Sequence, residues 1–317
     1  MLGMAYSTRC RVDDNHPMKR RRLLLLGSAL LFAALLLAAL GFYWWNLREP
    51  VLPTEIYQGV TYGCERLEAD EQGSGLMHWV RVDLTAPGIE LYVTPLDPQA
   101  AERGWQYRLQ HTATVLNKEQ LAVAINATYF SSDSGGVRRT GDFARSDVAT
   151  IANYVVSHVP EHTYLLCFDD HLVPSMERAW PPKDSLSRRF RWGLGGQGGP
   201  MLGHGKIYEG ASRKPTDART GVGVDREKRL LFLAVFENAS QRRALEKLAQ
   251  LGAEDGMLLD GGNSTSMAIG ATSHGVRPGV LIGDWRPVAT HFGVRARELT
   301  TGPHALVPTL APQSRLP

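Results

Sequence analysis

This sequence of 317 residues has few cysteines, lacks the common catalytic motifs and carries only a small net charge. Three cysteines are too few for a small disulfide-stapled fold. There is no HExxH, CxxC pair, Walker loop or GxSxG elbow, which argues against a zinc protease, a thioredoxin-like protein, a P-loop nucleotidase and an α/β-hydrolase. Residues 193–198 match the dinucleotide-binding GxGxxG pattern, but Pro200 follows at once and no helix is expected there.

Positive charge is concentrated at the N-terminus. The whole chain has 35 Lys and Arg against 32 Asp and Glu, a net of +3. Residues 1–22 hold six basic and two acidic side chains, a net of +4, which leaves −1 for the remainder. A nucleic-acid surface therefore has no support in the larger part of the chain. The apolar content of 43% is enough for a folded core.

One long apolar run follows this basic segment. Residues 23–45 contain no charged side chain, and a helix of that length would span roughly 35 Å, enough for a bilayer core. Four basic residues precede the run and a Tyr-Trp-Trp triplet ends it, as is typical of an anchor with a cytoplasmic N-terminus. A cleaved signal peptide is the alternative, but the run exceeds the usual length of about 7–15 residues and no small-x-small site follows.

We therefore predict a cytoplasmic basic tail over 1–22 and a single-pass signal anchor over 23–45, with the rest of the chain in the periplasm or outside the cell. Met18 directly precedes the basic cluster and is an alternative start. In an oxidising compartment Cys64 and Cys167 could pair. Two buried thiols remain an equal alternative, because the sequence does not show that the two residues are close.

The exported part is predicted to form one domain over 57–299, after a proline-containing linker over 46–56 and before a disordered tail over 300–317. Strands dominate its pattern. Apolar and charged residues alternate around 80–84, the period of a half-buried strand. Continuous apolar runs, typical of strands covered on both faces, occur at Leu121–Ile125 and Leu230–Phe236. Further strands are expected at Ile89–Val93, Met257–Leu259 and His291–Val294.

One helix is clear in the pattern. Gln241–Leu251 places its apolar residues on one face, and Gly252 follows as a C-terminal stop. A weaker helix is expected over Arg108–Leu116. Several strands with a few packed helices predict an α+β fold with mixed sheets.

Three segments combine strand ends with polar residues. Asp260 ends an apolar stretch and precedes two glycines and a group of hydroxyls, which suit an anion or a sugar, although a simple turn has the same pattern. Asn126 ends another buried strand and could instead close a turn. Arg219 begins a glycine-spaced apolar strand, where it could bind phosphate or form a structural ion pair. Arg286 is either a solvated loop charge or a second anion contact.

Together and in order, these segments resemble the phosphodiester glycosidase family from about Val80 to Val294. Any one match is short, but six in the same order are specific. The matching segments are Val80–Gly88 with the early strand pair, Asn126–Phe130 with an Asn-Gly-Gly-Phe-Phe-type motif, Gly198-Gly199-Pro200 with Gly-Gly-Pro, Arg219–Asp225 with the Arg-Thr strand, Leu259–Met267 with the Leu-Asp-Gly-Gly-Gly-Ser-Thr-x-Met signature and Arg286-Pro287-Val288 with Arg-Pro-Val.

The resemblance implies a hydrolase that cleaves a sugar-1-phosphodiester. Together with the predicted signal anchor, it suggests a bacterial, membrane-anchored member that acts in cell-envelope or exported glycan metabolism. In that reaction Asp260 would be base or nucleophile, Arg219 would bind the phosphate and Asn126 would position sugar or phosphate. The expected substrate-binding residues are Thr220, Ser264, Thr265, Gly261, Gly262, Gly199, Glu237 and Arg286. No cofactor is implied: carboxylates such as Asp217 could bind a divalent cation such as calcium, but no spacing favours a metal.

Several residues depart from the family pattern. Ala127-Thr128 replaces two glycines, Asn263 replaces a third, and Phe236-Glu237-Asn238 stands where the family has an Asp-Gly-Arg turn. Lost glycines restrict the approach of the backbone to a ligand. These changes leave two alternatives to an enzyme: a protein that binds phosphosugar or glycan without cleaving it, and an exopolysaccharide-assembly protein that uses the same pocket.

Overall fold

The structure is a computed structural model that describes residues 17–46, 50–132, 143–146, 150–152, 164–178, 189–196, 202–215, 217–271 and 273–300. The chain divides into two compact units, Met1–Glu49 and Pro50–Pro317. The predicted C-terminal tail beyond residue 300 and most of the predicted basic tail lie outside the described residues.

In the first unit, the described residues form one helix, α1 (Pro17–Asn46). Its leucines between Leu25 and Leu40 are exposed. Among the helices that the structure describes, none combines the length and the apolar character that a bilayer crossing needs. The anchor predicted over 23–45 is therefore unconfirmed and stays a prediction.

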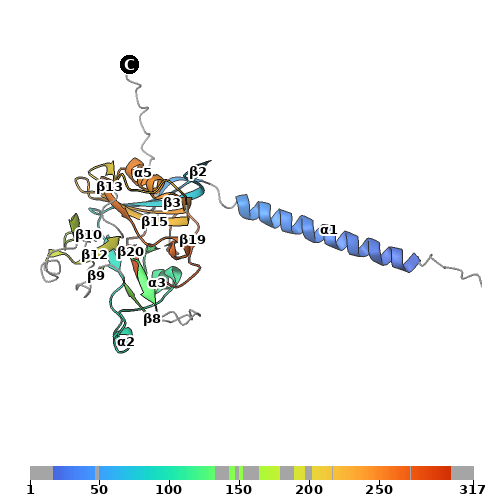
Figure 1. Cartoon of the computed structure of the whole chain (residues 1–317), viewed down its shortest axis with the longest axis horizontal. Helices are drawn as coiled ribbons and strands as arrows, with labels where there is room; N and C mark the ends of the chain where they lie inside the picture. The colour runs from blue at the N-terminus through green and yellow to red at the C-terminus, as the bar shows by residue number, and fades with distance from the viewer. Residues whose placement is uncertain are drawn as a thin grey trace, which may run out of the picture. The chain divides into compact units, whose positions relative to one another are not determined.

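The described part of the second unit contains four sheets, and its strand pairs are antiparallel. Strands of each sheet are labelled in Figure 1. The largest has eight strands, in the order β1 (Val51–Tyr57), β2 (Val60–Asp70), β3 (Gly73–Asp83), β16 (Leu230–Ala239), β15 (Asp217–Asp225), β17 (Asp255–Leu258), β13 (Leu202–Gly203) and β14 (Lys206–Ile207).

The other three sheets are smaller. The five-stranded sheet runs β19 (Gly279–Gly283), β18 (Ser266–Ile269), β6 (Val123–Asn126), β20 (His291–Arg295) and β4 (Glu90–Val93). The four-stranded sheet runs β11 (Pro174–Arg178), β10 (Tyr164–Phe168), β12 (Trp192–Gly196) and β9 (Thr150–Ala152). The three-stranded sheet runs β5 (Tyr107–Arg108), β8 (Phe143–Ser146) and β7 (Phe130–Ser132).

The main core lies between the eight-stranded and five-stranded sheets. Val80 and Leu233 of the larger sheet belong to the same buried cluster as Ile125 and Met267 of the smaller one. Helix α5 (Gln241–Leu251) covers the other face of the larger sheet through a second cluster that includes Leu248. The remaining described helices are α2 (Pro98–Ala101), α3 (Thr112–Lys118) and the 3-10 turn η1 (Gly262–Ser264).

The α+β class is confirmed, with more strand than helix. Helix α5 has the predicted bounds, because the Ser240 hydroxyl accepts a hydrogen bond from the N–H of Arg243 and Gly252 takes a φ of +108°. The expected strands at Ile89–Val93 and Met257–Leu259 occur as β4 and β17, within one or two residues.

Two element predictions are corrected. The helix expected from Arg108 begins only at Thr112. Arg108 lies in β5 and pairs with Phe143 of β8, and Gln110 forms a β-bridge with Val288. The linker expected over 46–56 is replaced in part by β1, which pairs with β2.

The structure also decides between the two alternatives for the cysteines. Cys64 and Cys167 are both buried, free thiols. Burial raises the pKa of the Cys64 thiol to about 11 and that of Cys167 further. Both groups are therefore protonated at neutral pH and poorly reactive.

Candidate active site

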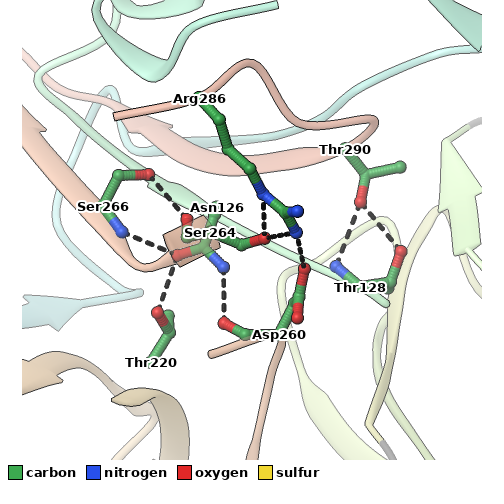
Figure 2. Close-up of polar contacts among 8 residues, drawn as sticks. All are labelled: Asn126, Thr128, Thr220, Asp260, Ser264, Ser266, Arg286 and Thr290. Atoms are coloured by element: carbon green, nitrogen blue, oxygen red, sulfur yellow. Dashed lines mark hydrogen bonds and ion pairs between the residues drawn. The ribbon is translucent and has the colours of Figure 1, made fainter. Parts of the chain in front are cut away.

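The candidate site is built where the five-stranded sheet meets the eight-stranded sheet. Asn126, the last residue of β6, has no exposed surface. Its amide oxygen accepts hydrogen bonds from the Thr220 hydroxyl at 2.6 Å and from the N–H of Ser266 at 3.0 Å. Its amide nitrogen donates to the carbonyl oxygen of Asp260 at 2.6 Å (Figure 2). One buried side chain therefore joins β15, β18 and the turn after β17.

The turn after β17 presents a carboxylate at the edge of the core. The N–H of Asp260 donates to the carbonyl oxygen of Ala127 at 3.0 Å, and the Asp260 side chain is 14% exposed. Gly262 has a φ of +59°, and a Cβ there would lie 2.7 Å from an oxygen of the Asp217 carboxylate. Both the backbone conformation and the nearby carboxylate therefore favour glycine at this position.

Arg286 reaches this turn from a segment that follows β19. Its Nε donates to the Ser264 hydroxyl oxygen at 3.0 Å, and a terminal nitrogen donates to the same oxygen (Figure 2). That terminal nitrogen lies 3.7 Å from the Asp260 carboxylate. The guanidinium carbon lies 5.2 Å from the centre of the Phe130 ring, a cation–π distance. Because Ser264 accepts from Arg286, its hydroxyl proton can still be donated to a ligand.

Arg219 approaches the same turn from β15. Its Nε donates to the carbonyl oxygen of Ala239 at 3.3 Å, and a terminal nitrogen lies 3.5 Å from the place that a Cβ on Gly261 would occupy. Burial raises the pKa of the nearby Tyr129, the Asp260 carboxylate raises it further and the Arg219 guanidinium opposes both effects. Two guanidinium groups, a carboxylate and a phenol therefore surround the turn.

The other predicted site residues lie at different places. Thr220 and Thr265 are buried, and the Thr265 hydroxyl has no hydrogen-bond partner within the described ranges. Glu237 on β16 accepts a hydrogen bond from the N–H of Leu76 on β3 at 2.9 Å. Gly199 lies outside the described residues. In the part of the chain that the structure describes, no three His, Cys, Asp or Glu side chains are grouped as metal ligands.

Two residues that replace family glycines lie inside the core. Ala127 and Thr128 are each 1% exposed, and neither has a positive φ. The Thr128 hydroxyl lies 2.8 Å from that of Thr290, which also accepts from the N–H of Thr128 at 3.0 Å (Figure 2). These two replacements are therefore accommodated without backbone strain and fill the interior below the site.

Sequence reasoning assigned no role to Tyr129, Phe130 or Ser266. Tyr129 lies near the charges of Asp260 and Arg219. Phe130 packs against the Arg286 guanidinium, and the N–H of Ser266 donates to the amide oxygen of Asn126. The two aromatic residues follow β6, the buried strand that ends at Asn126, and their side chains are only partly buried. Their position just after an apolar strand was the sequence feature that could have predicted two aromatic side chains beside the site.

Comparison with known proteins gives the same family as the motifs. The family model "Phosphodiester glycosidase" matches residues 119–295, more than half of the chain, and this range contains the whole constellation around Asp260. The chain belongs to the phosphodiester glycosidase family, and this membership places it in the general class of glycosidase-type hydrolases. A search of curated proteins found no match.

Two solved structures share the fold. A hypothetical protein from Synechocystis is 17% identical with a TM-score of 0.57, and the alignment covers 75% of this chain but only 62% of that protein. The zebrafish N-acetylglucosamine-1-phosphodiester alpha-N-acetylglucosaminidase catalytic domain, auto-inhibited by its pro-peptide, is 14% identical with a TM-score of 0.54, and the alignment covers 78% of this chain and 87% of that domain. At these identities the likeness establishes the fold alone.

Proposed function

We propose that this protein hydrolyses a sugar-1-phosphodiester and releases a free sugar and a phosphomonoester. The observation that carries the proposal is the contact of the Arg286 guanidinium with both the Ser264 hydroxyl and the Asp260 carboxylate. Arg219 reaches the same turn from the neighbouring strand, β15. Two guanidinium groups beside one carboxylate favour an anionic ligand, and their planar forks suit phosphate oxygens.

In this reaction, the bond between the anomeric carbon and a phosphate oxygen breaks, and the phosphomonoester leaves with the electron pair. Such a leaving group is already acidic, so stabilising its charge contributes more than protonating it. Arg219 and Arg286 are assigned to the phosphate oxygens, and the Ser264 hydroxyl donates a further hydrogen bond. A site of this kind needs one well-placed carboxylate in addition to its phosphate-binding groups.

Asp260 is that carboxylate. As a base it would take a proton from the water that attacks the anomeric carbon. As a nucleophile it would form a glycosyl ester that water then hydrolyses. The two routes give opposite anomers of the sugar, inverted in the first and retained in the second, so the stereochemistry of the product distinguishes them.

Asn126 and Thr220 have a supporting part in this proposal. Thr220 donates its hydroxyl proton to Asn126, and the amide of Asn126 is itself paired inside the protein. Ser264 is equally buried, but it only accepts from Arg286 and keeps its hydroxyl proton for a ligand. The hydrogen bonds of Asn126 hold the Asp260 backbone and the strand that carries Arg219. We therefore assign them to positioning rather than to contact with the substrate, which changes the role that the sequence had implied for Asn126.

The test is turnover of a panel of sugar-1-phosphate diesters by the protein and by its variants, followed by sugar release. Asp260→Asn and Arg219→Ala should each lower kcat/KM by about 100-fold or more, because each removes a charged group from the reacting atoms. Arg242→Ala is the matched control, since Arg242 pairs with Glu246 on the surface of α5. A fully active Asp260→Asn protein would remove Asp260 from the mechanism.

Binding without turnover would favour the non-catalytic alternative. In that case a sugar phosphate should bind the protein with an affinity that Arg219→Ala and Arg286→Ala lower and Asp260→Asn leaves unchanged. The replacement of two family glycines by Ala127 and Thr128 does not favour this alternative, because both residues fit in the core without backbone strain. A sugar-1-phosphate titration followed by calorimetry measures these affinities directly.

The proposed setting is a membrane-anchored protein that acts on cell-envelope or exported glycan. It rests on the sequence of residues 1–45 alone. Alkaline extraction of membranes from expressing cells tests it: the full chain should stay in the pellet, and a chain that lacks residues 1–45 should not. Release of the full chain by alkali would exclude an anchor.

A further inference from the structure

On either side of Arg286 in the sequence, a residue is hydrogen-bonded to the short segment at the start of α3. On its C-terminal side, the backbone of Val288 exchanges two hydrogen bonds with Gln110, at 3.0 and 2.8 Å. On its N-terminal side, the Asp284 carboxylate accepts from the N–H of Thr112 at 2.7 Å and from that of Ala113 at 3.2 Å. The backbone of Arg286 is thereby fixed at both ends, two residues away on each side.

Asp284 is adapted to this contact. Its side chain is only 9% exposed, and its φ of +64° is a conformation that aspartate adopts more readily than most residues. It caps α3 from outside, because the cap residue His111 makes no side-chain cap of its own. His111 instead places its Nδ1 3.1 Å from the Asp284 carbonyl oxygen and 3.4 Å from the carboxylate.

The same turn of α3 also reaches the partner of Arg286. The Thr112 hydroxyl lies 2.6 Å from the Ser266 hydroxyl, and both are buried. The Ser266 hydroxyl in turn lies 3.4 Å from the carbonyl oxygen of Ser264. Thr112 therefore takes part in both sets of hydrogen bonds. Its N–H contacts Asp284, near Arg286, and its hydroxyl contacts Ser266, which lies beside Ser264.

We propose that Asp284 is a positioning residue, which uses the first turn of α3 to hold Arg286 and Ser264 in the arrangement that receives the phosphate. The inference rests on the proposed function, and it adds a residue outside the reacting groups. Asp284 acts through Arg286 and does not touch the substrate. Its loss leaves the guanidinium present but free to move away from Ser264.

The effect should be large because misplacement by about 1 Å can lower an enzyme's rate by about 100-fold. We expect Asp284→Gly to lower kcat/KM about 10- to 100-fold, through both a lower kcat and a higher KM, because the phosphate is bound before and during the reaction. Glycine is the appropriate replacement, because it accepts a positive φ without strain while alanine does not. Asp284→Asn keeps an acceptor oxygen and tolerates the same backbone, so it should recover most of the lost activity.

A double-mutant cycle separates positioning from general stability. Arg286→Lys keeps the charge but loses the planar fork that Ser264 contacts. If Asp284 acts through Arg286, Asp284→Gly should change kcat/KM by less than about 3-fold in the Arg286→Lys background. Asp97→Asn is the control, since Asp97 also caps a helix, α2, through a hydrogen bond from the N–H of Gln99 at 2.8 Å. It should leave kcat/KM unchanged.

The same cycle is run on the equilibrium binding of N-acetylglucosamine 1-phosphate, which needs no turnover. Coupling between residues 284 and 286 in binding supports the inference even if no diester is hydrolysed, an outcome that refutes the proposed function alone. Additive effects in both binding and turnover overturn the positioning role of Asp284. Failure of the unaltered protein to bind N-acetylglucosamine 1-phosphate or any other sugar 1-phosphate of the panel overturns the inference together with the proposed function.

Discussion

Acidification should destabilise this protein through His291, a residue of β20 with no exposed surface. Burial lowers the pKa of His291 from 6.5 to about 3. Below pH 6.5 the unfolded chain takes up a proton on this side chain and the folded chain does not, so unfolding becomes more favourable as the pH falls. At about 1.4 kcal/mol per pH unit, the loss of stability reaches about 2 kcal/mol at pH 5 and ends near pH 3.

Urea unfolding at pH 7, 6 and 5 measures this loss. His291→Gln removes the titrating group, so its free energy of unfolding should fall less steeply with pH than that of the unaltered protein, by about 1.4 kcal/mol per unit. Parallel curves for the unaltered protein and His291→Gln would refute the assignment of a low pKa to His291.

Three further predictions concern stability and reactivity. Asn126→Ala should lower the free energy of unfolding by about 3 kcal/mol or more, since it leaves three buried polar groups unpaired; urea unfolding measures it, and a change below about 1 kcal/mol would contradict the role of this amide. Gly283→Ala should destabilise more than Gly205→Ala in thermal unfolding. Both glycines have a positive φ, but only at Gly283 would a Cβ meet the Thr265 carbonyl oxygen, at 1.7 Å; equal effects would argue against that close contact. In a Cys10→Ser background, a thiol reagent should label Cys64 and Cys167 only after unfolding, and an absence of thiols in the unreduced, unfolded chain would reveal a disulfide instead.

The local sequence pattern was enough to predict an element when residues within that same segment determine its structure. Helix α5 follows from apolar residues spaced for one face and from a capping serine and glycine at its ends, all within one segment. The apolar runs at β6 and β16 likewise predicted strands covered on both faces. Strand β1 and the late start of α3 depend on pairing with distant residues, which no local pattern contains.

The same distinction between local sequence and tertiary structure applies to the candidate site. The sequence determined which residue types carry the chemistry, because the motif order around Asn126, Arg219 and Asp260 indicated a phosphodiester glycosidase, and the family match agrees. Only the tertiary structure decided their arrangement. It buried Asn126 as a support, paired Arg286 with Ser264 and tied Asp284 to α3. Hydrogen bonds between residues 22 to 172 positions apart depend on how the sheets pack, and that packing is a property of the whole core.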